Sequence, residues 1–173
     1  MTIISPLSQI GHKVIRARAA EVTLPLGDAD KQTVQDLIDT LHPANLVGIA
    51  APQIGRGVRI FVTELRPTEF RKIDADPLRV FINPEILEMS EEKVLGYEGC
   101  GSVAHSGLFG EVYRAHAVTV RYFDEHEVQH TRRFEGFLAR VIQHEFDHIE
   151  GTVFLDRLHT TKTVMSGSVF RGE

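Results

Sequence analysis

The chain has 173 residues, 42% of them hydrophobic, which is enough for a globular domain with a sizeable apolar core. Its formal net charge of -5 argues against direct nucleic-acid recognition and against a membrane-surface role. There is no run of about 18 apolar residues for a transmembrane helix, and the N-terminus lacks the pattern of a secretory signal. We therefore expect a cytoplasmic protein with one domain over residues 1–173. The single cysteine, Cys100, excludes an intramolecular disulfide.

The first predicted helix spans Asp28 to Leu41, where apolar side chains recur at helical spacing. Asp28 or Asp30 is expected to cap its start, and Pro43 follows its end. After this helix come several short segments rich in β-branched and aromatic residues, which predict strands. The last two are expected to form a hairpin across residues 124–126. The predicted strands cover residues 58–63, 80–83 (ending before Pro84), 94–97, 117–123 and 127–134.

The last strong element is a helix predicted from about Glu135 to Glu150, with Gly151 placed to end it in the left-handed conformation. Its wide apolar stripe indicates a buried helix with strands packed against it. Because the strands precede this helix along the chain, we expect the α+β class. The predicted architecture is a set of mostly antiparallel sheets packed around a central helix that carries residues 144–148.

Residues 144–148 have the sequence H-E-F-D-H. On a helix, His144 and His148 share one face, so two imidazoles can bind one metal ion. Glu145 sits beside the first histidine, where its carboxylate can take a proton from water. This pattern predicts a metal, a nucleophile and a base.

A catalytic centre of this kind needs a third protein ligand. In one family of proteases a third histidine follows the motif, but Phe154 occupies that place here. In another family a downstream glutamate completes the site, and Glu150 and Glu173 are poorly placed for that role. Cys100, upstream, is the softest ligand available. The remaining histidines stand singly in loops or on strand faces, where a surface or satisfied histidine is the better interpretation.

Residues 48–55 form a run of small residues that includes one amide side chain, Gln53. This run has two interpretations. It is either a tightly packed turn before the next strand, or a wall where the backbone approaches a ligand and Gln53 donates a hydrogen bond.

Three motifs, in this order, resemble the peptide deformylase family. They are L-V-G-I-A-A-P-Q at residues 46–53, E-G-C-G-S at 98–102, and Q-H-E-F-D-H at 143–148 with Gly151 soon after. The resemblance covers most of the chain. It continues through Phe81–Pro84, Arg114, Ala139–Arg140 and Phe154–Arg157.

The resemblance implies an enzyme that removes the N-formyl group from the initiator methionine of new proteins. Cys100, His144 and His148 would hold one divalent metal, with Fe(II) expected and Zn(II) or Ni(II) found in stable preparations. A metal-bound hydroxide would attack the formyl carbon, with Glu145 as general base and then acid. The side chain of Gln53 and the N–H of Gly101 would stabilise the charge on the formyl oxygen.

The resemblance also implies further sites and partners. The substrates would be N-formyl-Met nascent peptides, met near the exit tunnel of the ribosome. The substrate groove and its methionine pocket would include Leu46, Val47, Gly48, Phe137 and Val141, with part of His144. Residues behind the ligands would include Glu98, Arg114 and Asp147.

The sequence departs from the family pattern at three positions. Leu46 replaces the first glycine of the first motif, Gly101 replaces a common leucine, and Ala104 replaces a frequent proline. Leu46 is expected to reshape the groove beside the substrate. Leu46 and Gly101 motivate one alternative, a related metalloamidase for a different N-acyl substrate. Two alternatives from other classes are a non-catalytic homologue with a structural metal and a binding module without metal.

Overall fold

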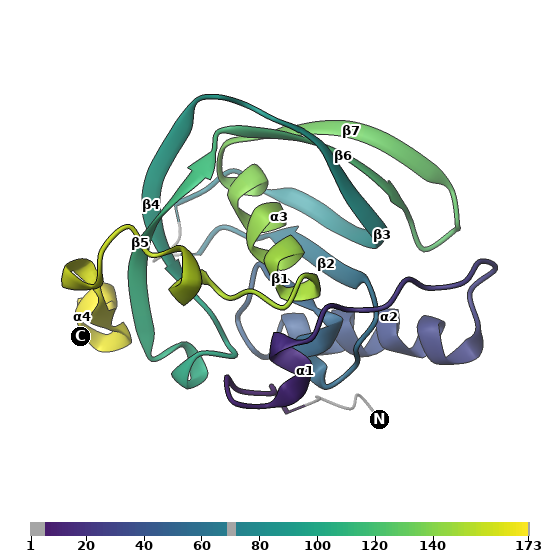
Figure 1. Ribbon diagram of the computed structural model, residues 1–173, viewed down its shortest axis with the longest axis horizontal. Helices are drawn as coiled ribbons and strands as arrows, with labels where there is room; N and C mark the ends of the chain where they lie inside the picture. The colour runs from purple at the N-terminus through teal and green to yellow at the C-terminus, as the bar shows by residue number, and fades with distance from the viewer. Residues whose placement is uncertain (1–5, 69–71, 173) are drawn as a thin grey trace.

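The computed structural model describes residues 6–68 and 72–172, and its strands form two antiparallel sheets (Figure 1). The first sheet has the strand order β1-β2-β3-β6-β7, and the second has the order β4-β5-β8. The strands are β1 (Gly48–Ala50), β2 (Ile60–Leu65), β3 (Asp76–Met89), β4 (Lys93–Gly99), β5 (Leu108–Ala115), β6 (Ala117–Phe123), β7 (Gln129–Glu135) and β8 (Met165–Ser166). The helices are α1 (Lys13–Arg16), α2 (Asp28–Leu41), α3 (Gly136–Ile149) and α4 (Gly167–Arg171).

Helix α3 lies near the middle of the molecule and contacts strands of both sheets (Figure 1). It follows β7 directly, with Glu135 and Glu150 flanking its ends, as the apolar stripe predicts. The predicted α+β class with antiparallel sheets is confirmed. Within the described part of the chain, no helix is long and apolar enough to cross a membrane.

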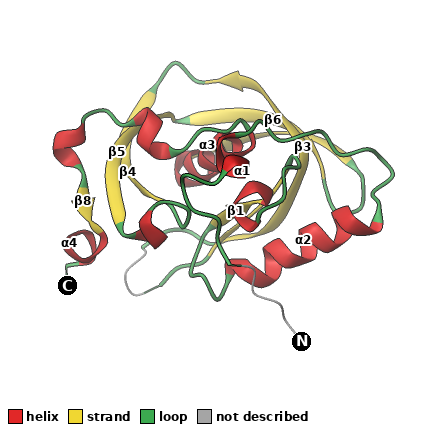
Figure 2. Cartoon of the chain, turned by 60° about the horizontal axis from the view of Figure 1, so that its bottom comes forward, coloured by secondary structure: helices red, strands yellow, loops and turns green. Residues whose placement is uncertain are grey.

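The first sheet is buried on both faces at β2 and at the middle of β3, where apolar side chains alternate between two layers. Phe61 of β2 packs in the cluster that contains Ile142 of α3, whereas its neighbours Ile60 and Val62 pack in the cluster that contains Leu37 of α2. Figure 2 shows the two helices well separated, with α3 near the centre and α2 at the lower edge. This sandwich of α2, sheet and α3 fixes the position of α3 relative to β1.

Gly151 ends α3 as predicted, with φ of 76°. A Cβ atom at this position would lie 2.6 Å from the carbonyl oxygen of Arg16. Ala19, three residues further on, donates its backbone N–H to the carbonyl of Ile149. The glycine therefore allows the segment after α1 to pack against the end of the helix that carries the histidines.

Several strand boundaries differ from the sequence-based expectation. Strand β3 does not end before Pro84 but runs through it, because the pairing register shifts between Ile82 and Glu85. At this bulge Asn83 has φ of 48°, and its side chain bonds both the N–H and the carbonyl of Val22. The shift places the proline where no ladder hydrogen bond is required of it.

Other differences concern strands that the pattern did not indicate, and one cap. Strand β5 was not predicted, and residues 48–50, expected to be either a tight turn or a wall, form the edge strand β1. Helix α2 has the predicted bounds, but Gly27 is its N-cap and no side chain caps it. Asp28 and Asp30 lie in its first turn instead. The hairpin of β6 and β7 is confirmed.

Candidate metal centre

The structure brings Cys100, His144 and His148 together. One ligand atom from each lies within 4.8 Å of the others, and the Sγ of Cys100 is 3.2 Å from the Nε2 of His148. The two histidines come from successive turns of α3, and Cys100 follows the last residue of β4. Cys100 and His148 are almost fully buried. A thiolate and two imidazoles converging on one point form a donor set that suits a divalent transition metal.

Two hydrogen-bond donors lie near the sulfur of Cys100. The backbone N–H of Ser102 lies 3.4 Å from Sγ, and the Nε2 of Gln53 lies 3.6 Å from it. The thiolate is the form of cysteine that binds metal. Burial holds the pKa of His148 well below its usual value, so this ring is neutral and its lone pair is available.

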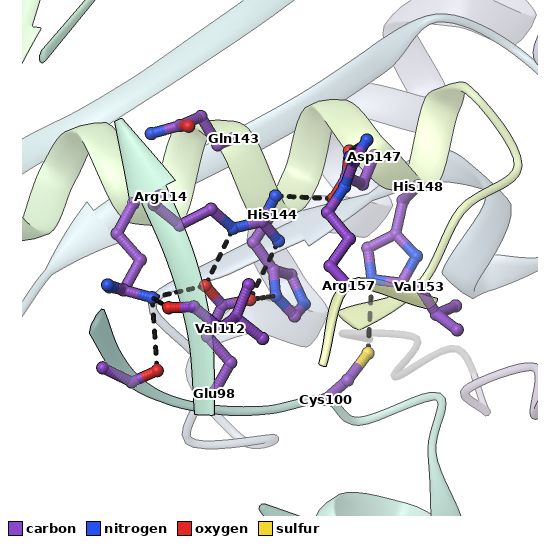
Figure 3. A network of polar contacts seen from close by, with 12 residues as sticks. Glu98, Cys100, Val112, Arg114, Gln143, His144, Asp147, His148, Val153 and Arg157 are labelled. Carbon is purple, nitrogen blue, oxygen red and sulfur yellow. Dashed lines mark hydrogen bonds and ion pairs between the residues drawn. The ribbon is translucent and has the colours of Figure 1, made fainter. Parts of the chain in front are cut away.

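Glu98 fixes the orientation of His144. Its Oε2 lies 2.9 Å from the Nδ1 of His144, which leaves Nε2 of that ring to face the metal site (Figure 3). A carboxylate behind a ligating histidine sets both the tautomer and the ring angle. Burial alone would raise the pKa of Glu98, but hydrogen bonds from Arg114 and His144 outweigh it and hold the pKa far below its usual range. Glu98 is therefore ionised.

Two buried arginines hold Glu98 in turn. Arg114 on β5 donates to both carboxylate oxygens at 2.9 Å, and Arg140 on α3 donates to one of them at 2.8 Å. Arg114 also donates to Asp147 at 2.7 Å, and Arg157 makes a bidentate pair with the same aspartate. This network ties both turns of α3 to the second sheet.

Sequence reasoning placed Glu98, Arg114 and Asp147 behind the ligands, and the structure brings these three into one ion-pair network. It did not assign roles to Arg140 or Arg157. Arg140 is buried, and a buried arginine needs a carboxylate partner. That requirement indicates a carboxylate partner for Arg140, and the structure identifies Glu98 as that partner.

Glu145 lies against the backbone of β1. A Cβ atom on Gly48 would lie 2.5 Å from the Oε1 of Glu145, so this glycine leaves the space that the carboxylate occupies. Burial raises the pKa of Glu145 to about 7. Its Oε2 has no hydrogen-bond partner among the described residues. A buried carboxyl with an open oxygen and a pKa near neutrality suits proton transfer.

Gly48→Ala is expected to displace Glu145 while leaving the metal ligands in place. Because a misplacement of about 1 Å can cost roughly 100-fold in rate, turnover should fall about 10- to 100-fold. The measurement is turnover per bound metal ion. Gly57→Ala is the matched control, since an added Cβ there meets nothing within 4 Å. Equal turnover in the two variants would contradict the fitted position of Glu145.

Gln53 contacts the sulfur of Cys100, and Gly101 is the next residue along the chain. The Oε1 of Gln53 accepts a hydrogen bond from the N–H of Ala50 at 2.9 Å, so its Nε2 faces Cys100. Gln53 belongs to a 3₁₀ turn, Ala51–Ile54, directly after β1. Gly101 follows Cys100, and Leu46 lies beside it, about 3.6 Å from where a Cβ would stand. The Gln53 amide therefore lies next to one of the three proposed ligands.

The predicted pocket residues have mixed environments. Val141 is buried, whereas Phe137, one turn earlier on α3, is 40% exposed. Phe137 lines a surface cavity of about 950 Å³ together with Leu65, His116 and Leu138. The lining of that cavity does not include Val47 or Val141.

Residues 4–164 match the family model described as polypeptide deformylase. The chain belongs to the peptide deformylase family. The resemblance noted in the three motifs is thereby confirmed, and the chain is an enzyme of the hydrolase class that takes part in protein biosynthesis. Family and fold both support deformylation of nascent peptides.

Curated peptide deformylases match over most of their length. The chain is 37% identical over 160 residues to the peptide deformylase of Pseudothermotoga lettingae, covering 92% of this chain and 86% of that protein. It is 40% identical over 164 residues to the peptide deformylase of Roseiflexus castenholzii, covering 90% and 87%.

Solved peptide deformylases have the same fold. The Met-Ala-Ser-bound class I type b enzyme from Acinetobacter baumannii superposes with a TM-score of 0.84 at 35% identity, over 91% of this chain and all of that one. The enzyme from Thermotoga maritima gives a TM-score of 0.79 at 33% identity, over 91% and 99%.

Peptide deformylases depend on a metal, and the residues of this chain fit one. The donor set is a thiolate and two imidazoles, and Glu98 leaves one nitrogen of His144 for the ion. Near them, Glu145 presents a buried oxygen that has no partner among the residues described. Each of these features is expected of a centre that binds metal and water.

Proposed function

We propose that this chain removes the N-formyl group from the initiator methionine of nascent polypeptides, with one divalent metal held by Cys100, His144 and His148. The observation that carries the proposal is the placement of Glu145. Its buried carboxylate lies in the space left by Gly48, next to the three ligands. A metal that only stabilised the fold would need no such base, and it would need no amide such as Gln53 aimed at the same point.

When bound, the metal supplies a Lewis acid that brings the pKa of water toward neutrality. Glu145 then takes the proton of the attacking water and later delivers it to the departing amine. Because its pKa is raised by burial, the same carboxyl can hold and release a proton near neutral pH.

Negative charge develops on the formyl oxygen as the carbonyl carbon becomes tetrahedral. The Nε2 of Gln53, held by the bond from Ala50 to its Oε1, is one proposed donor to that oxygen. The backbone N–H of Gly101 is the other. Both act through fixed dipoles that need not reorganise during the reaction, which is the favourable arrangement for stabilising a transition state.

We further propose Fe(II) as the working metal, with Zn(II) or Ni(II) able to occupy the same ligands. Val47, Phe137, Val141 and part of His144 would receive the methionine side chain. Leu46 and Gly48 would border the peptide. The encounter with the substrate would take place in the cytoplasm, near the exit tunnel of the ribosome. The Met-Ala-Ser peptide in the Acinetobacter baumannii enzyme supports a tripeptide as the test substrate.

The test is release of the free peptide amine from formyl-Met-Ala-Ser by anaerobically prepared Fe(II) protein. Acetyl-Met-Ala-Ser and formyl-Ala-Ala-Ser serve as competing substrates. The proposal predicts turnover of formyl-Met-Ala-Ser well above both. If formyl peptides are inert and another acyl amide reacts, the chain is instead a metalloamidase with a different substrate, the alternative that the departures at Leu46 and Gly101 motivate.

A further inference from the structure

The N-terminal segment Leu7–Ile10 connects the two loops that carry the proposed donors. The N–H of Ser8 donates to the backbone carbonyl of Gln53 at 2.8 Å, and the N–H of Ile10 donates to the carbonyl of Ser102 at 2.8 Å. Two backbone bonds from one short segment therefore join the turn after β1 to the loop after β4.

Gln9 lies between these two bonds and clamps the second loop. Its Nε2 donates to the carbonyl of Gly101 at 2.8 Å, and its Oε1 accepts the N–H of His105 at 3.0 Å. The Gln9 amide thus links Gly101 to His105 through two hydrogen bonds. Gly101 is the residue directly after the proposed ligand Cys100.

The clamped loop has an unfavourable backbone. Ala104, His105 and Ser106 have φ of 48°, 53° and 62°, which is the left-handed region for three consecutive residues other than glycine. Such residues persist only where surrounding contacts hold them. The bond from His105 to Gln9 is one such contact, and it comes from 96 residues away along the chain.

Leu7 completes the contact through packing. A Cβ atom on Gly101 would lie 2.6 Å from the Cδ1 of Leu7 and 3.6 Å from the Cδ1 of Leu46. The side chain missing at Gly101 is therefore replaced by leucines from two other segments. This complementarity explains how the loop stays packed although its residue beside the metal site has no side chain.

From these contacts we propose that Gln9 is a positioning residue, which sets the place of the Gly101 N–H relative to the Gln53 amide. The proposal rests on the proposed function, because those two groups are its donors to the formyl oxygen. Among the residues described, the hydrogen bonds of the Gln9 side chain involve Leu7, Gly101 and His105 and no metal ligand. Its effect is transmitted through the Cys100–Ser106 loop.

The test compares Gln9→Met with the wild type, both loaded with Fe(II). Methionine keeps the length of the side chain and removes its hydrogen bonds with Gly101 and His105, together with a 3.2 Å bond to the carbonyl of Leu7. Because misaligned donors weaken binding of the transition state rather than of the substrate, kcat should fall about 10- to 100-fold with KM and metal content unchanged. Amide hydrogen exchange should become faster in residues 101–106.

Gln35→Met is the matched control, since Gln35 is an exposed glutamine paired only with Asp39 on α2 in the contacts seen here. It should leave both readouts unchanged. Gln9→Glu is a second variant, which keeps the acceptor for His105 and loses the donor to Gly101. Because a carboxylate oxygen would then face the Gly101 carbonyl oxygen, Gln9→Glu should lower kcat and speed exchange at least as much as Gln9→Met. It serves if Gln9→Met does not fold.

An unchanged kcat in Gln9→Met, or a reduced kcat without faster exchange in residues 101–106, would overturn the positioning role. A wild-type protein that releases no formate is a different result, because it refutes the proposed function and the inference with it. If the wild type is active and Gln9→Met has the wild-type kcat, the inference is refuted and the proposed function stands.

Discussion

Replacing Glu145 with glutamine should reduce kcat for formyl-Met-Ala-Ser by about 100- to 10,000-fold, the range expected when a general base is removed. The amide has nearly the same shape as the carboxylate, so the contact with Gly48 is kept while proton transfer is lost. Metal content and the free energy of unfolding should remain close to those of the wild type. The measurement is single-turnover formate release per bound metal ion.

Glu91→Gln is the control for Glu145→Gln, because Glu91 is exposed and distant from α3 in the chain. A Glu145→Gln variant that retains both metal and wild-type kcat would refute the general-base role. It would favour a metal whose role is structural. That alternative also predicts cooperative unfolding when the metal is removed.

Arg114→Met is expected to have the largest effect on stability. Arg114 bonds Glu98 and Asp147, and all three side chains are almost fully buried. Removing one partner of a buried ion pair leaves an uncompensated charge, which typically costs 3–5 kcal/mol, about 3 kcal/mol being expected here. The lower end of the range applies because Arg140 still pairs with Glu98, and Arg157 with Asp147. Urea denaturation measures the change.

Arg121→Met is the matched control for Arg114→Met. Arg121 pairs with Glu85 on the surface, where the two side chains are 46% and 56% exposed. Exposed pairs contribute only about 0–1 kcal/mol. If both variants lose a similar free energy of unfolding, the burial of Arg114 is not the reason for its contribution to stability.

Elements with a strong local pattern could be predicted from the sequence. Helix α2 has apolar residues at helical spacing over its full length, and β6 alternates apolar and polar residues, so both were predicted with the bounds observed. The histidines of α3 follow from the same spacing rule, since residues four apart share a helix face. Local periodicity therefore predicted the two proposed metal ligands that lie on α3, but not the third, Cys100.

Elements that depend on tertiary contacts could not be predicted in this way. Strand β5 lacks a regular alternation, because Gly110 and Glu111 are adjacent in it. Its pairing with β4 and β8 stabilises it rather than its own propensity. Strand β1 has three residues and no period to detect. The passage of β3 through Pro84 depends on contacts between Asn83 and Val22, which are far apart in the chain.

The same division holds for the site. The ligand atoms of Cys100 and of the two histidines lie close together, and the family motifs already indicated these residues. The contacts of Arg140 with Glu98, and of Gln9 with the loop after Cys100, join segments more than 40 residues apart. No spacing rule links such residues, so only the folded chain reveals them.

Metal analysis of the anaerobically purified protein tests the central claim most directly, because every role proposed for Glu145, Gln53 and Gly101 depends on an ion held by Cys100, His144 and His148. The account predicts close to one divalent metal ion per chain in the wild type, and strongly reduced binding in Cys100→Ala. A metal content near zero in the active, folded wild type would contradict it.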